Sequence, residues 1–135
     1  MSGCRVLCSQ EERAWIEDVD LQYKERPIPN FYGLLNQSVK VDDILRDGQV
    51  ISPEPGLDLE VIYSPGHSAG SISYLHHQSG ILFSGDAIPI VGDIPIYISV
   101  KDSLNTFDRL EQLKEIRSIA SAWADLWQDS EAKER

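Results

Sequence analysis

The chain has 135 residues, the size of one ordinary domain, and its 41% hydrophobic and 25% charged residues are typical of a globular protein. Its formal net charge of −10 disfavours nucleic acids and anionic membrane surfaces as partners, because both are bound through clusters of Lys and Arg. The longest apolar run, residues 87–91, is far too short to span a bilayer, and residues 1–9 lack the apolar core of a signal peptide, so we expect a cytoplasmic protein with no membrane or nucleic-acid partner.

The N-terminal residues predict a short strand followed by a helix. Residues 4–8 form an apolar run, and Ser9 with Glu12 three positions later matches a capping box, so we expect a helix from about Gln10. The cysteines at the two ends of the strand would share a face but lie roughly 13 Å apart, too far for a disulfide. Two cysteines are also too few for a zinc knuckle, so we expect free thiols.

Turn-forming residues dominate the next part of the chain. Residues 24–38 combine Pro, Asn and Gly with aromatic residues, and we expect an irregular loop there. The Asp-Gly pair at 47–48 predicts a hairpin that joins strands at 39–43 and 49–51. Residues 53–56, Pro-Glu-Pro-Gly, predict the turn that follows.

Three strands are predicted in the middle of the chain. Residues 57–63 alternate apolar and acidic side chains with a period of two, which is typical of a half-buried strand. Residues 71–75 and 81–84 read as the two strands of a hairpin. His67 follows the first of these strands, and Asp86 follows the last.

The remaining residues predict a loop, a helix and an end segment. Residues 88–97 are rich in Pro and apolar side chains, which suits either a pocket wall or a buried crossover loop. Ser103 is placed to cap a helix with apolar residues at three-residue spacing, namely Leu104, Phe107, Leu110 and Leu113. Residues 119–123 fit a final strand or a continued helix, and 125–135 read as a polar tail, which leaves 1–124 as one domain.

The most informative stretch is residues 64–71, Ser-Pro-Gly-His-Ser-Ala-Gly-Ser, followed by Phe-Ser-Gly-Asp at 83–86. Asp86 follows His67 by 19 positions, which is enough for one strand, one turn and one strand back. A hairpin of that kind returns the Asp to the sheet edge that carries the His. An imidazole nitrogen with a carboxylate oxygen is a ligand pair that suits zinc, manganese or non-haem iron.

These two segments resemble the later half of the metallo-β-lactamase-fold hydrolases, with the resemblance running from about Gly3 to Trp123. The matching residues are Pro65, Gly66, His67, Ser68, Gly70 and Ser71, then Leu82, Phe83, Ser84, Gly85 and Asp86. The resemblance implies an α/β fold, namely a partial α/β/β/α sandwich that holds mainly the second αβ half, a mixed sheet with flanking helices. It also implies that His67 binds one metal ion and that Asp86 bridges two, with zinc or another divalent metal as the cofactor. In the family, insertions such as residues 24–38 often shape the substrate pocket, and a surface loop anchored by two aromatic residues is the alternative.

The first metal-binding motif of that family, His-x-His-x-Asp-His, is absent from this sequence. The histidines of the chain are His67, His76 and His77, so no such cluster exists. We expect His76 and His77 to be an exposed pair in a turn, at the opposite end of the hairpin from the candidate ligands. Asp93 and Asp102 could reach a pocket, although Asp102 is more simply a residue of a helix start.

Two functions are compatible with this pattern. The first is a truncated metal-dependent hydrolase that retains the His67 and Asp86 motifs, binds metal weakly and is inactive by itself. In its complete form it would hydrolyse a small ester, thioester, amide or phosphodiester, with an N-terminal half or a second copy as partner. The second is a non-catalytic subunit or decayed paralogue that binds other molecules through its surface.

Overall fold

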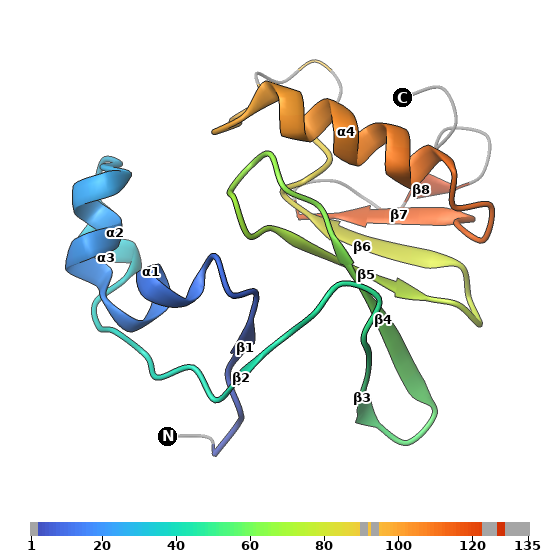
Figure 1. The fold of residues 1–135 in the computed structure, drawn as a ribbon, viewed down its shortest axis with the longest axis horizontal. Coiled ribbons are helices and arrows are strands. Elements are labelled where there is room, and N and C mark those ends of the chain that lie inside the picture. The colour runs from blue at the N-terminus through green and yellow to red at the C-terminus, as the bar shows by residue number, and fades with distance from the viewer. Residues whose placement is uncertain (1–2, 90–91, 93–94, 123–126, 129–135) are drawn as a thin grey trace. The chain divides into compact units, whose positions relative to one another are not determined.

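The computed structural model describes residues 3–89, 92, 95–122 and 127–128. The chain divides into two compact units, Met1–Leu45 and Arg46–Arg135, which we call the N-terminal and C-terminal units (Figure 1). No helix within the described ranges is both long enough and apolar enough to cross a membrane.

The N-terminal unit contains three short helices and two short strands. In chain order they are β1 Leu7–Cys8, α1 Arg13–Glu17, α2 Val19–Glu25, α3 Phe31–Leu34 and β2 Asp43–Ile44. β1 and β2 pair in parallel. Both cysteines are free thiols, as predicted: Cys4 is exposed and Cys8 is buried, and burial raises the pKa of the Cys8 thiol.

Two predictions for this unit were wrong. The first helix begins at Arg13 and not at Gln10, so Ser9 does not cap it. The side-chain cap belongs instead to α2, where Asp18 accepts hydrogen bonds from the backbone N–H groups of Asp20 and Leu21. Residues 24–38 are not wholly irregular, because they contain the end of α2 and all of α3. Three aromatic rings pack together there and hold α3 against α2, namely Tyr23, Phe31 and Tyr32.

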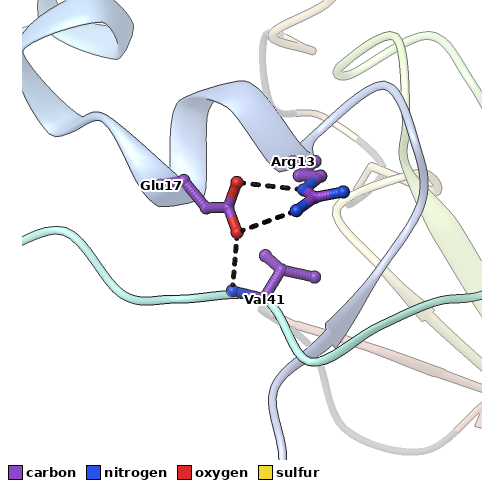
Figure 2. A network of polar contacts seen from close by, with 3 residues as sticks. All are labelled: Arg13, Glu17 and Val41. Carbon is purple, nitrogen blue, oxygen red and sulfur yellow. Dashed lines mark hydrogen bonds and ion pairs between the residues drawn. The ribbon is translucent and has the colours of Figure 1, made fainter.

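A carboxylate joins α1 to the chain that leads into β2. Glu17 accepts hydrogen bonds from Arg13 Nε at 2.9 Å and from the backbone N–H of Val41 at 3.0 Å (Figure 2). The bond from the Arg13 guanidinium, followed by the one from Val41, lowers the pKa of Glu17 below its ordinary value. The charged form of Glu17 therefore helps to hold α1 in place.

The C-terminal unit is built around a mixed sheet, with the described strands in the order β3-β4-β5-β6-β7-β8. Their bounds are β3 Val50–Glu54, β4 Leu57–Tyr63, β5 Ile72–His76, β6 Ile81–Gly85, β7 Ser118–Ser121 and β8 Trp127–Gln128. Neighbours from β3 to β6 are antiparallel, β7 is parallel to β6, and β8 is antiparallel to β7. The mixed sheet confirms the predicted α/β class.

The sheet carries a core on one face. α4, Val100–Glu111, connects β6 to β7 and lies over one face of the sheet (Figure 1). Leu110 of α4 packs there with residues from β4, β5, β6 and β7, namely Ile62, Leu75, Leu82 and Ile119. Because side chains alternate along a strand, the paired residues Tyr74, Phe83 and Ala120 lie on the opposite face, where Phe83 is 42% exposed.

Strand boundaries agree with the sequence at 57–63, while two predictions for the C-terminal unit need correction. The Asp47-Gly48 turn exists, with Gly48 at φ 74°, but it does not join a hairpin, because β2 pairs with β1 and β3 pairs with β4. α4 is capped by Ser99, which accepts a hydrogen bond from the backbone N–H of Asp102, and Ser103 lies buried inside the helix.

The ambiguous stretch at 119–123 begins as a strand and not as a continued helix. β7, Ser118–Ser121, covers its residues 119–121, while Trp123 lies outside the described residues. Within the segment 125–135, residues 127–128 form β8 on the edge of the sheet. The boundary between a domain at 1–124 and a tail remains a prediction.

Candidate metal centre

His67 and Asp86, the two candidate ligands, lie side by side. The distance between His67 Nε2 and Asp86 Oδ2 is 3.8 Å, and their side chains are 24% and 40% exposed. β4 and β6 are both antiparallel to β5, so their carboxyl ends lie at the same edge of the sheet. His67 follows β4 and Asp86 follows β6, which is the arrangement that the hairpin argument predicted.

The loop that carries His67 is closed by its own serines. The Ser64 N–H donates to the Ser71 carbonyl at 2.9 Å, where the loop leaves and re-enters the sheet. Ser68 and Ser71 join their hydroxyls at 2.8 Å, and the Ser68 N–H bonds to the Ser71 hydroxyl at 3.1 Å. These bonds make the turn around His67 a defined structure, and they explain the physical role of the serines in the motif.

The beginning of α4 holds the same loop from the other side. The carbonyl of Gly66 accepts hydrogen bonds from the N–H groups of Ile98 at 2.8 Å and Ser99 at 3.1 Å. The hydroxyl of Thr106, a buried residue, donates to the Pro65 carbonyl at 2.8 Å. Pro65 and Gly66 are therefore fixed to α4, and His67 follows directly.

An ion pair supports the end of β4 from outside the loop. Asp47 accepts from the Tyr63 N–H at 2.7 Å with one oxygen and pairs with the Arg109 guanidinium at 2.9 Å with the other. Arg109 also donates to the Tyr63 carbonyl at 3.2 Å. Together these contacts tie α4 to the last residue of β4, just before the His67 loop begins.

The segment that carries Asp86 turns sharply out of the sheet. Gly85 has φ 54°, in the left-handed region that favours glycine, and the pairing of β6 with β7 is irregular between Phe83 and Gly85. The Ala87 N–H donates back to the Ser84 carbonyl at 3.0 Å. This turn moves Asp86 off the strand and toward His67.

The donor atoms of this pair fit part of a divalent-metal site. Two ligand atoms that each lie about 2.1 Å from a tetrahedral zinc ion are about 3.4 Å apart, slightly closer than the two atoms here. A small rotation of either side chain would bring both atoms to such an ion. A catalytic zinc ion needs three protein ligands, and within the described residues no group of three His, Cys, Asp or Glu side chains could hold a metal ion.

The other residues considered from sequence take no part in this site. His77 is exposed and bonds to Glu60 through Nε2 at 2.6 Å, at the far end of the β5–β6 hairpin. His76 is half-buried and not exposed as expected, with Nδ1 bonded to the Ser79 hydroxyl at 2.8 Å. Asp102 lies in the first turn of α4, as predicted, and Asp93 lies outside the described residues.

Sequence reasoning missed the residues that anchor the loop. The Asp47-Gly48 pair indicated a turn, but not a contact with the loop. No local sequence pattern indicated a role for Arg109 or Thr106. Their contacts join residues 41 to 62 positions apart, which a local motif cannot reveal.

Comparison with known proteins gave consistent matches over most of the chain. The family model of the metallo-beta-lactamase superfamily matches residues 3–117, across both units. The chain is 32% identical over 106 residues to the acyl-coenzyme A thioesterase MBLAC2 of Homo sapiens, covering 76% of this chain and 37% of that protein. It is 30% identical over 84 residues to a hydroxyacylglutathione hydrolase of Legionella pneumophila (strain Paris), covering 62% and 33%.

Solved structures show the same fold. A metallo-beta-lactamase family protein from Thermus thermophilus, TTHA1429, superimposes with a TM-score of 0.74 at 21% identity, over 98% of this chain and 51% of that one. TTHA1623, crystallised in a di-iron-bound form, gives a TM-score of 0.70 at 18% identity, over 96% and 62%. The chain thus spans about a third of the length of the curated relatives it matches and about half of TTHA1429.

Proposed function

The chain belongs to the metallo-beta-lactamase superfamily, and on this basis we propose that it carries the His67 and Asp86 part of the metal centre of a hydrolase. The observation that carries the proposal is the 3.8 Å approach of His67 Nε2 to Asp86 Oδ2 at one sheet edge. The remaining ligands would come from residues outside these two motifs, on another segment or another chain. Zinc or another divalent metal is the proposed cofactor, because imidazole and carboxylate suit such ions.

We propose a thioester as the class of substrate. The curated relatives are named as an acyl-coenzyme A thioesterase and a hydroxyacylglutathione hydrolase, and acyl derivatives of thiols are thioesters. In hydrolysis the oxygen of water bonds to the acyl carbon, the carbon–sulfur bond breaks, and a carboxylic acid and a thiol leave. A bound divalent metal supplies the activated water and polarises the carbonyl.

The residues of this chain would hold the metal ion in a defined position. His67 and Asp86 would hold the metal from the ends of β4 and β6, the two strands that flank β5, so their separation is set by the sheet. The serine bonds of the loop and the contacts from α4 keep His67 in place. Preorganisation of this kind matters because a misplacement of about 1 Å can cost about a hundredfold in rate.

An exposed aromatic ring on the sheet supports a partner for this chain. Phe83, in the middle of the sheet, is 42% exposed on the face opposite α4. We propose that the rest of the hydrolase packs against this face, as a further segment or a separate subunit. A second copy of the chain is the alternative occupant.

One observation favours a second function, a non-catalytic binding subunit. Among the described residues, His67 and Asp86 have no third ligand with which to form a metal-binding group. A chain with two ligands could retain the fold and lose the chemistry. The experiment below separates the two functions.

The test is thioester hydrolysis by the 135-residue chain, with and without a polypeptide that carries the first motif of a family member. We expect no metal-dependent turnover by the chain alone, turnover on complementation, and its loss in His67→Ala but not in the control His77→Ala. Failure of every complementing polypeptide to restore turnover would favour the binding subunit. Chelator-sensitive turnover by the chain alone, lost in Asp86→Ala, would show that the chain already holds a complete site.

A further inference from the structure

Four large aliphatic side chains are exposed within the short segment where the chain enters α4. Ile96 is 68% exposed, Ile98 54%, Val100 63% and Leu104 57%. We call this set the apolar strip. Single exposed aliphatic residues are ordinary, but a contiguous group of them usually marks a binding surface.

The strip is exposed because its neighbours are turned inward. Tyr97 packs its ring against Phe107 of α4, with ring centroids 6.4 Å apart, and its hydroxyl is buried. Ser99 uses its side chain to cap α4. Ile96 and Ile98 stand next to these two anchored residues in the chain, and both are exposed. The fold therefore holds the aliphatic side chains out in a fixed arrangement.

The strip adjoins the candidate metal centre. The N–H groups of Ile98 and Ser99 both donate to the carbonyl of Gly66, the residue directly before His67. Val100 begins α4 one residue later, and Leu104 follows one helical turn further on. The backbone of the segment that carries the strip is thus bonded directly to the loop that presents His67.

We propose that the apolar strip binds the aliphatic acyl chain of the substrate, an inference that rests on the proposed thioester hydrolysis. The occupant must be apolar because four aliphatic side chains offer it no charge or hydrogen bond. From Ile96 to Val100 the backbone spans at most about 14 Å, the length of a medium-chain acyl group. A substrate whose acyl carbon lies at His67 could lay its chain along this surface.

The experiment measures binding of straight-chain alcohols to the 135-residue chain without metal, by amide chemical-shift titration. Butan-1-ol, hexan-1-ol and octan-1-ol are uncharged, so the net charge of −10 does not repel them. A fully buried methylene improves affinity about fourfold, and an open strip should give about twofold per methylene. We expect octan-1-ol, with four more methylenes, to bind about sixteenfold more tightly than butan-1-ol, with shifts centred on residues 96–104.

The variants are chosen for equal exposure. Val100→Ser and Ile98→Ser should weaken octan-1-ol binding at least about threefold and flatten the dependence on chain length. Val50→Ser is the matched control, because Val50 is 57% exposed on β3, close to the 63% of Val100. Binding that is independent of chain length, or that Val50→Ser weakens as much as Val100→Ser does, would overturn the proposal.

Sedimentation of the same samples tests whether a second copy of the chain, and not an acyl chain, covers the strip. If Val100→Ser abolishes self-association and leaves octan-1-ol binding unchanged, the strip is a contact between copies and the acyl proposal is wrong. Because the titration needs neither metal nor turnover, its result is separate from that of the hydrolysis assay. If the alcohols bind but complementation restores no turnover, the apolar strip remains a binding surface for aliphatic chains, and the proposed thioester hydrolysis is wrong.

Discussion

Gly66 and Ser103 approach each other so closely that no side chain fits between the His67 loop and α4. A Cβ atom added at Gly66 would lie 2.8 Å from the Cα of Ser103, and Gly66 has φ 144°. Only glycine combines that backbone conformation with that contact. The placement of His67 therefore depends on a helix more than thirty residues further along the chain.

Replacing Gly66 with Ala should destabilise the C-terminal unit strongly. Strain at this φ and the collision with the Ser103 backbone together should cost about 2–4 kcal/mol in the free energy of unfolding. The control is Gly48→Ala, where φ is 74° and nothing lies within 4 Å of an added Cβ, so only about 1 kcal/mol is expected. Urea unfolding measures both. Equal losses in the two variants would mean that the contact with Ser103 does not matter.

Thr106→Val should remove the hydrogen bond to the Pro65 carbonyl while nearly keeping the shape of the side chain. Thr106 is 4% exposed, so the carbonyl loses its partner in a buried place, and we expect a loss of about 1–2 kcal/mol. Thr106→Ser keeps the hydroxyl and should lose less. Chemical denaturation measures the free energy of unfolding of the native chain and both variants. If the serine variant is less stable than the valine variant, the packing of the Thr106 methyl group matters more than the hydrogen bond.

Glu17 should make stability depend on pH. The hydrogen bond from Arg13 holds the pKa of Glu17 below its ordinary value of 4.5, so its contribution is present above that value and lost as the pH falls through the folded pKa. Glu17→Gln should therefore be less stable than the native chain near about pH 7, and the difference should shrink as the pH falls below 4.5 and through the lowered pKa of Glu17. Denaturant titrations at several pH values measure it. Glu11→Gln, at an exposed position of the same segment, controls for the change in net charge.

The exposed ring of Phe83 should make the 135-residue chain self-associate. Phe83 exposes 42% of its surface on the sheet face opposite α4, where Val61 is buried, and a second copy could cover this ring. Phe83→Ser should shift light scattering at high concentration toward the monomer, whereas Val50→Ser, at a position that is 57% exposed, should not. A native chain that stays a compact monomer with cooperative unfolding would contradict the need for a partner on this face.

Local patterns predicted the approach of His67 to Asp86 because both residues follow strands of the sheet. His67 and Asp86 each follow an apolar run, and the alternation of side chains with one tight turn was enough to bring them to one edge. The support of the site could not be predicted in the same way. Thr106 reaches Pro65 across 41 residues, and nothing in either neighbourhood indicates the other.

Errors at the element boundaries have a similar origin. Ser99 and Ser103 are both acceptable helix caps by local rules, and the choice between them depends on Ser103 packing against Gly66. The Asp47-Gly48 turn was predicted correctly, but the pairing of the strands that flank it was not. Asp47 bonds to Tyr63 and Arg109, and the flanking strands β2 and β3 pair with β1 and β4. Long-range pairing decided both cases.

The most direct test of the account is a zinc titration of the dialysed 135-residue chain, with elemental analysis before it begins. Complete structural sites gain about 10–16 kcal/mol from their full ligand sets, so two ligands should retain well under one equivalent and bind added zinc weakly. His67→Ala and Asp86→Ala should each remove that weak binding, and His77→Ala should not change it. A full equivalent retained through dialysis, or binding that survives both substitutions, would contradict the assignment of His67 and Asp86 as the ligands of an incomplete centre.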